Sequence, residues 1–195
     1  MNIQPLLSIV KKTVVIAGLG FASISPALAA NDYQAINTPH YLQMGKVLHG
    51  DEVSDQTAQV VAQEARNFLG YYHQLLLKQD VDGIAKIWTQ DGLLMMPTWA
   101  VASKSNGLLQ KDYTAVFNAI TIDSSPEFMQ INVLTPTHVI VTLNAIGIET
   151  VKKTGERHLD PNREIFILAK INGEWKIQYY MFNQRVEEPM INKSK

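Results

Sequence analysis

The repeat of apolar residues changes its period about midway along this 195-residue chain. Between residues 57 and 79, apolar side chains recur at spacings of three and four, which places them on one face of a helix. These side chains are Val61, Ala65, Phe68, Tyr72, Leu75 and Leu76. From residue 129 onward, apolar and polar residues alternate instead, as they do in half-buried strands. Helices that precede a run of hairpin-connected strands indicate an α+β domain.

Two shorter helices and one short strand are predicted between these regions. Asp80 can accept the free amides at a helix start, and the apolar stripe behind it consists of Val81, Ile84, Ala85 and Trp88. The dipeptide Asp91-Gly92 is expected to end this helix and to turn into a strand at 93–96. A third helix is predicted at about 107–120. Asp80 and Asp91 therefore receive structural roles rather than catalytic ones.

Turn signals divide the second half of the chain into four antiparallel strands. The period changes after the Asp-Ser-Ser-Pro stretch of residues 123–126. Turns are expected at "TPT" (135–137), "KKTGER" (152–157) and "LDPN" (159–162), and at the hairpin dipeptide Asn172-Gly173. Three helices cannot cover both faces of such a sheet evenly. The sheet is therefore expected to curl around the longest helix and to leave an apolar cavity at its concave end.

The first 29 residues have the composition of a secretory signal peptide. Lys11 and Lys12 precede an apolar run of about 12 residues, and Ala27-Leu28-Ala29 follows it. The run is shorter than the roughly 20 residues that a membrane span requires. We predict cleavage after Ala29 and a periplasmic or secreted protein. The remaining chain divides into a polar arm or linker at 30–56, a domain at 57–185 and a tail at 186–195.

Composition excludes several other classes of protein. The formal net charge is −1 and charge runs are short, so neither nucleic acid nor an anionic membrane surface is a predicted partner. The chain has no cysteine, which excludes disulfides and a thiol nucleophile. The five histidines show no metal-ligand spacing, and no glycine-rich phosphate loop is present. We therefore predict neither a metal nor a cofactor.

Three stretches resemble one known family. "FLGYYHQLLLKQDVDGIAKIWTQDGLLMMP", "SNGLLQKDYTAVF" and "NGEWKIQYYMFNQ" are similar to the opening, the following helix and the closing hairpin of the nuclear transport factor 2-like superfamily. Within it, the closest likeness is to the SnoaL-like, ketosteroid-isomerase-like group. The resemblance covers about 57–184. It implies a cone-shaped, curved antiparallel sheet wrapped around a long N-terminal helix, with three helices in all (a cystatin-like roll).

The resemblance leaves the chemistry open, because members of this superfamily include isomerases, cyclases, dehydratases, hydrolases, ligand binders and assembly domains. In many relatives the last strand continues into histidine and aspartate positions. Here the corresponding residues are Tyr179, Tyr180 and Met181, which supply no obvious group that titrates near neutral pH. No catalytic residue is assigned on this basis.

Aromatic and methionine side chains are the candidate lining of the cavity, because rings offer large contact area and thioethers adapt in shape. The predicted ligand-binding residues are Tyr72, Trp88, Met96, Trp99, Tyr113, Phe117, Tyr179 and Asn183. Their alternative role is packing in the core. Trp99 lies in a loop, where it could cap the mouth of the pocket.

The polar candidates lie on strands, where alternation permits only some of them to face inward; they are Asn144, Arg163, Glu164 and Asn183. A buried hydroxyl of Tyr72 or Tyr179 could donate to a ligand carbonyl, and Glu164 is the strand carboxylate that could serve as a base beside it.

Three functions remain open at this point. The first is an exported protein that binds a small apolar or aromatic molecule. The second is an isomerase, cyclase or dehydratase that uses the same pocket, which requires a carboxylate or histidine facing the cavity. The third is a homodimeric assembly module, because Ile140, Ile146 and Ile148 alternate with the core residues and would leave an apolar outer face.

Overall fold

The computed structural model describes residues 45–185, apart from the side chains of Glu127 and Phe128. The predicted signal peptide with its expected cleavage site, most of the expected arm and the expected tail at 186–195 lie outside the described residues. No helix in the described part of the chain is long and apolar enough to cross a membrane.

The longest helix is α3 (Asp55–Lys78), which confirms the helix expected from the apolar stripe. It begins where the Ser54 hydroxyl accepts a hydrogen bond from the Thr57 amide at 3.3 Å. It ends at Gln79, whose left-handed conformation lets its amide bond the last carbonyls. Its buried face consists of Ala58, Val61, Ala62, Ala65, Arg66, Leu69, Tyr72 and Leu75.

The second helix, α4 (Val81–Lys86), is shorter than expected. Asp80 caps it by accepting the Gly83 amide at 2.8 Å, which confirms the structural role of Asp80. The helix stops before Trp88, and Trp88 instead begins β2 (Trp88–Met95), where its backbone pairs with Ile177. Asp91-Gly92 lies inside this strand, at a shift of register, so the expected helix-ending turn was wrong. The third helix, α5 (Leu108–Ala119), lies close to its predicted position.

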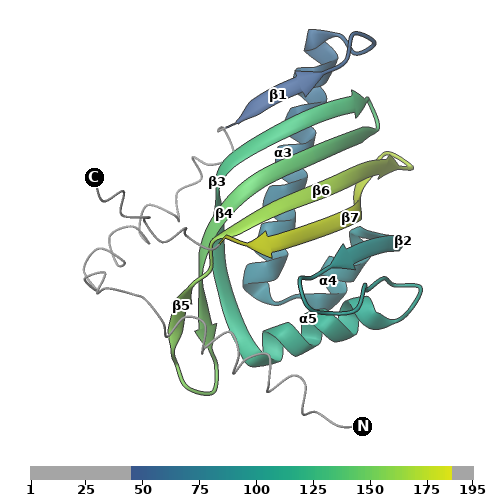
Figure 1. Ribbon diagram of the computed structural model, residues 1–195. Helices are drawn as coiled ribbons and strands as arrows, with labels where there is room; N and C mark the ends of the chain where they lie inside the picture. Colours follow the sequence, from purple (N-terminus) through teal and green to yellow (C-terminus); the bar gives the residue numbers. More distant parts are fainter. Residues whose placement is uncertain (1–44, 186–195) are drawn as a thin grey trace, which may run out of the picture. The chain divides into compact units, whose positions relative to one another are not determined.

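One mixed sheet contains all the strands of the described residues, in the order β1-β3-β4-β6-β7-β2, with β5 paired to β4. Its strands are β1 (Lys46–His49), β2, β3 (Ile120–Thr135), β4 (His138–Val151), β5 (Arg157–Leu159), β6 (Asn162–Ile171) and β7 (Glu174–Gln184). The four central strands are antiparallel, as predicted. The edge strands differ, because β1 pairs with β3 and β2 pairs with β7 in parallel. Figure 1 shows the long strands curving across α3, with α4 and α5 at one end.

Strand β3 begins earlier than the change of period after residues 123–126 indicates, because residues 120–126 already pair with β4. Pro126 cannot donate to a ladder, and it is tolerated where the register shifts between Pro126 and Phe128. A long partner strand therefore extends β3 beyond its alternating stretch.

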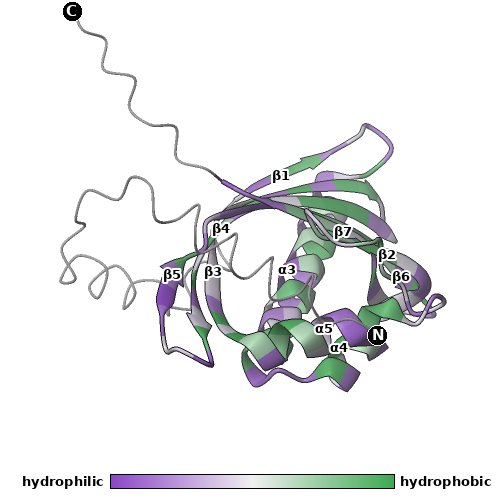
Figure 2. Cartoon of the chain, turned by 60° about the horizontal axis from the view of Figure 1, so that its bottom comes forward, coloured by the Kyte–Doolittle hydropathy of each residue, from purple (hydrophilic) through white to green (hydrophobic). Residues whose placement is uncertain are grey.

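The alternation along β4 is confirmed. Val139, Val141, Leu143 and Ala145 are buried on the inner face, toward the helices, whereas the residues between them are only half-buried. In Figure 2 the sheet folds over the three helices, so this inner face is enclosed between the two layers. The hydrophobic core lies there and includes Trp88, Leu109, Phe117, Ile131, Phe166, Leu168 and Ile177.

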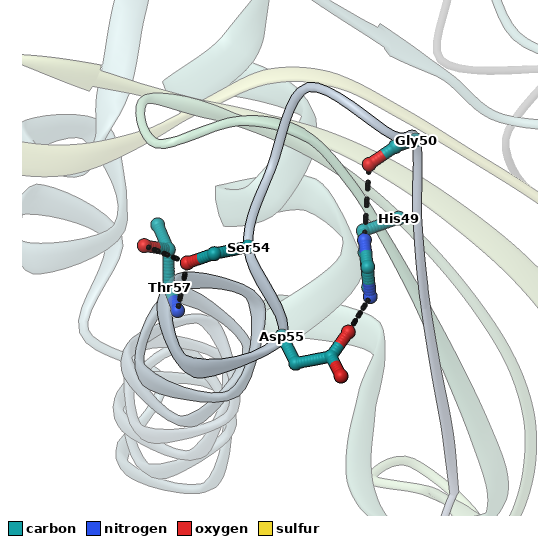
Figure 3. Close-up of polar contacts among 5 residues, drawn as sticks. All are labelled: His49, Gly50, Ser54, Asp55 and Thr57. Atoms are coloured by element: carbon teal, nitrogen blue, oxygen red, sulfur yellow. Dashed lines mark hydrogen bonds and ion pairs between the residues drawn. The ribbon is translucent and has the colours of Figure 1, made fainter.

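Strand β1 comes from the segment expected to be an arm, and a polar contact joins it to the start of α3 (Figure 3). The Nδ1 atom of His49 faces the Gly50 carbonyl at 3.0 Å, and its Nε2 atom lies 2.9 Å from Asp55. The Gly50 carbonyl and Asp55 both favour the protonated ring and raise the pKa of His49. The contact between β1 and the start of α3 is therefore strongest when His49 is protonated.

Gly147 is required where β3 and β4 approach most closely. A Cβ atom there would lie 2.7 Å from the Ser124 Cβ and 2.9 Å from the Asp123 carbonyl oxygen. We expect Gly147→Ala to lower the free energy of unfolding by about 1–3 kcal/mol, as overpacking does. Urea denaturation followed by tryptophan fluorescence measures this change. Gly50→Ala is the matched control, because nothing lies within 4 Å of its added methyl group; equal effects of the two substitutions would contradict the prediction.

Candidate functional site

Strands β5 and β6 present a row of polar side chains on the inner face. Opposite β4, His158 pairs with Glu149, Asp160 exchanges both backbone hydrogen bonds with Gly147, and Asn162 pairs with Ala145. The register is unbroken across Pro161, so β5 and β6 behave as one strand along β4. Because alternate residues share a face, the row on the inner face consists of His158, Asp160, Asn162 and Glu164.

Glu164 lies at the inner end of this row, directly across from Leu143 on one side and Phe182 on the other. Its Oε2 atom accepts a hydrogen bond from the Tyr180 hydroxyl at 3.1 Å. Burial raises the pKa of Glu164 to about 7, the Tyr180 hydrogen bond partly opposes this, and the charge of Asp160 adds to it. The residue nevertheless remains partly accessible to solvent. Glu164 can therefore both accept and release a proton near neutral pH.

An aromatic wall surrounds this carboxyl group. The rings of Phe166 and Tyr180 stack with their centroids 4.1 Å apart, and Phe182 stacks on the other side of Tyr180 at 5.5 Å. Tyr72, from α3, meets Phe166 and Tyr180 edge-on at 5.8 Å and 6.1 Å. The wall is well suited to contact flat apolar rings.

Two tyrosine hydroxyls form a pair near the wall. The hydroxyls of Tyr72 and Tyr113 lie 2.7 Å apart, in a hydrogen bond in which either can be the donor. Burial raises the pKa of both phenols, so they stay protonated at neutral pH. Trp88 is a further, weak hydrogen-bond donor to Tyr113 and slightly lowers its pKa. Whichever hydroxyl accepts the Tyr72–Tyr113 bond does not use its own hydrogen in it.

Besides Glu164, two carboxyl groups lie on the inner face: Asp160, in the polar row, and Glu149, on the neighbouring strand. Glu149, on β4, and Asp160 are close enough for the charge of Asp160 to raise the pKa of Glu149 to about 7, after the larger effect of burial. Burial also raises the pKa of Asp160, while hydrogen bonds from Asn162 and Gln184 oppose it. Within residues 45–185, no group of histidine or acidic side chains converges tightly enough to hold a metal ion.

Several predicted site residues are brought together. Tyr72 and Tyr113 form the hydroxyl pair, and Phe117 packs on Tyr113 with ring centroids 5.8 Å apart. Trp88 is 1% exposed and lies beside Tyr113, where its indole N–H makes no well-formed hydrogen bond. These four residues belong to the core next to the site. Tyr72 and Tyr113 supply the hydroxyl pair, and Phe117 and Trp88 pack around it.

Tyr179 and Asn183 do not face this site, and their role in ligand binding stays a prediction. They pair with Ile167 and Arg163, whose side chains point to the outer face, and both are exposed. Tyr180, one residue along, faces inward instead. On the outer face, Asn183 borders an open hollow of about 390 Å³, whose other lining residues are Thr142, Leu143, Asn144, Arg163, Glu164, Ile165 and Met181.

Met96 and Trp99 lie in and beside the turn that follows β2. Met96 is partly buried against the core, and Trp99 is half-buried, with its amide 3.4 Å from the Met96 carbonyl oxygen. The role of Trp99 as a cap over the pocket stays a prediction.

The sequence contains an alternating pattern that predicts the polar row, but the turn-forming residues in the same stretch favoured a different interpretation. "HLDPNRE" places His158, Asp160, Asn162 and Glu164 at alternate positions, which is the period of a strand. Its "LDPN" portion favours a turn in local terms because of the proline. Pro161 is tolerated in this ladder because its backbone faces away from β4. The neighbouring Asp160 makes both hydrogen bonds to Gly147, and on the other side the Pro161 carbonyl accepts the Arg185 amide.

Solved structures of other proteins share this architecture, although no protein-family model and no curated protein matches the chain. A ketosteroid isomerase-like protein from Erwinia carotovora atroseptica is 22% identical, with a TM-score of 0.55, over 69% of this chain and 100% of that one. A protein from Novosphingobium aromaticivorans, provisionally assigned as a scytalone dehydratase, is 13% identical, with a TM-score of 0.63, over 68% and 89%. A cystatin-like fold protein from Caulobacter vibrioides is 11% identical, with a TM-score of 0.54, over 63% and 88%.

These likenesses, at low sequence identity, establish the fold. The chain is an α+β cone in which a curved sheet covers a long helix, the cystatin-like fold of these structures. The family resemblance of the three sequence stretches is thereby confirmed at the level of architecture.

Replacing Glu164 by glutamine tests the pKa of this carboxyl group. Its pKa is about 7 in the folded protein and near 4.5 when unfolded. The folded state therefore holds the extra proton between these values, and stability falls as pH rises through that window. We therefore expect the free energy of unfolding of Glu164→Gln, relative to that of the wild type, to increase by up to about 3 kcal/mol from pH 4 to pH 8. This follows from about 1.4 kcal/mol per pKa unit.

Urea denaturation of both proteins across this pH range measures the difference in free energy of unfolding. Glu156→Gln, in an exposed turn, is the matched control and should show no such trend. A pH-independent difference for Glu164→Gln would show that its carboxyl group ionises normally.

Proposed function

We propose that the protein binds a small apolar or aromatic molecule with a carbonyl group, and that Glu164 exchanges a proton with this molecule. The observation that carries the proposal is the Glu164 carboxyl group itself: it lies on the inner face, has a pKa of about 7 and is bordered by aromatic rings. It is the carboxylate facing the interior that an acid–base enzyme of this fold requires.

The chemistry follows from the groups around Glu164. A carboxylate with a pKa near the working pH is an effective general base. It would remove a proton from the carbon next to the ligand carbonyl, and the electrons of the broken C–H bond would move onto the carbonyl oxygen. The hydroxyl hydrogen that the Tyr72–Tyr113 bond does not use can stabilise that oxygen as charge develops.

The proton held by Glu164 then has two destinations. Returned to a different carbon, it completes an isomerisation. Delivered to a departing hydroxyl group, it releases water and completes a dehydration. The names of two structural neighbours, a ketosteroid isomerase-like protein and a provisional scytalone dehydratase, support these two reaction types for the fold.

The proposed location is outside the cytoplasm. It rests on the predicted signal peptide of residues 1–29 alone, which lies outside the described residues. A ligand that reaches the protein there would come from the periplasm or the surroundings of the cell.

Hydrogen–deuterium exchange of a ketone tests both parts of the proposal. We expect the mature protein to bind acetophenone or a cyclic enone from a ketone panel, and to speed the loss of its α-protons in D₂O, followed by proton NMR. Glu164→Gln should retain binding and reduce the exchange rate by about 100-fold or more, the usual contribution of a general base. Tyr180→Phe should shift the pH dependence of exchange, because Tyr180 hydrogen-bonds the base.

Glu156→Gln, in an exposed turn, is the matched control and should retain both binding and exchange. Binding without exchange would leave a binding protein and remove the enzyme. A melting temperature that no ketone raises would contradict the proposal as a whole.

A second copy of the chain is the partner we propose for the outer face of the sheet. Tyr179 and Met181 are 36% and 47% exposed there, next to the half-buried Ile165 and Ile167. Apolar area of this kind favours association. Sedimentation velocity is expected to show a dimer that Met181→Glu dissociates, whereas Val60→Glu, at an exposed apolar position on α3, leaves it intact. A wild-type monomer at high concentration would refute the dimer.

A further inference from the structure

We propose that Glu149, Asp160 and Asn162 form a second subsite on the inner face, which binds the protonated amino group of a ligand. The inference rests on the proposed function, because the apolar part of the same ligand would contact the aromatic wall at Glu164. It adds the chemical class of that ligand: an aromatic or apolar compound that carries an ammonium group.

The register of the sheet places the subsite next to the wall. Asn162 and Glu164 are alternate residues of β6, and Asp160 precedes them at the same period on the same face. Glu149 comes to this face from β4, opposite His158. The subsite thus continues the inner surface that the tyrosines and Glu164 begin.

One hydrogen-bond acceptor in the subsite lacks a donor. Asn162 is only 7% exposed, and its Nδ2 atom donates to the Asp160 carboxylate at 2.7 Å. The Oδ1 atom of the same amide is buried without any hydrogen-bond partner. A buried acceptor left unpaired is costly, so a bound group with a hydrogen to donate would satisfy this atom. The buried Nε2 atom of the neighbouring His158 also has no partner, and it can donate or accept according to the tautomer of the ring.

The balance of charge indicates a cation. Asp160 and Glu149 are half-buried and raise each other's cost of ionisation. The nearest arginines on the same strands do not compensate them, because Arg157 and Arg163 pair with Thr150 and Asn144 on the opposite face. Among the described residues, no lysine or arginine contributes to the pKa of either carboxyl group.

The spacing indicates a polyatomic cation rather than a metal ion. Within residues 45–185, the acidic and histidine side chains do not converge on one point as metal ligands must. An ammonium group carries three hydrogens in different directions. It can reach separate acceptors, such as the Asn162 Oδ1 atom and the two carboxylates, from one position.

Matched aromatic probes test the subsite. Benzylamine, benzyl alcohol and acetophenone share a ring, and the first alone carries a positive charge at pH 8. Isothermal titration calorimetry should show that the wild type binds benzylamine at least tenfold more tightly than benzyl alcohol. Titrations in buffers of different ionisation enthalpy should show proton release, because Glu149, His158, Asp160 and Glu164 are the titratable groups on this face.

Asp160→Asn and Glu149→Gln should abolish the preference for the amine while leaving acetophenone binding unchanged. Glu156→Gln removes the same charge from an exposed turn and should retain the preference. Both test substitutions reduce repulsion between buried charges, so loss of the fold is not expected; circular dichroism confirms this.

Failure of the subsite and failure of the proposed function are distinguishable. Acetophenone binding with equal affinity for benzylamine and benzyl alcohol would overturn the ammonium subsite and leave the proposed function intact. An amine preference that survives both Asp160→Asn and Glu149→Gln would overturn it as well. If no probe binds, the site proposed for Glu164 fails, and the subsite fails with it.

Discussion

One unbroken register joins β4 to β5 and β6, and the arrangement of the site depends on it. Because side chains alternate along a strand, this register puts Leu143, Glu149 and Glu164 on the same face. A slip of one residue would bring Arg163 inside and turn the polar row outward. Such a slip is costly, since the buried Phe166 and Leu168 of β6 would leave the core at the same time.

The same register places ionisable groups where burial disfavours their charge. Burial is the first cause of the raised pKa values of Glu149, Asp160 and Glu164, and the charge of Asp160 raises those of Glu149 and Glu164 further. Buried acids of this kind lower stability, and departures from the rules of core packing are expected at functional sites. Here they adjoin stacked aromatic rings, so one inner surface offers apolar contact, proton exchange and hydrogen-bond acceptors together.

Much of the fold could be predicted from local patterns, but the facing of single residues could not. The stripe of α3, the Asp80 cap and the alternation of β4 are local, and all three are confirmed. Tyr179 and Tyr180 are adjacent tyrosines of one strand, and the sequence does not show which of them faces inward. The pairing of β7 with β6 decides that it is Tyr180. The turn signal at 159–162 was misleading, and β3 begins before the change of period at 123–126, since a long partner strand holds both segments extended.

The sequence alone determined the fold class, the long helix, the central antiparallel strands and the aromatic residues available to the interior, because hydrophobic period and helix caps act over a few residues. Tertiary structure alone decided that Tyr72 meets Tyr113 and that Tyr180 meets Glu164, contacts that join residues 41 and 16 positions apart. It also decided that Glu164 has a pKa near 7. A pKa depends on burial and on neighbouring charges, and both exist only once distant strands and helices have packed together.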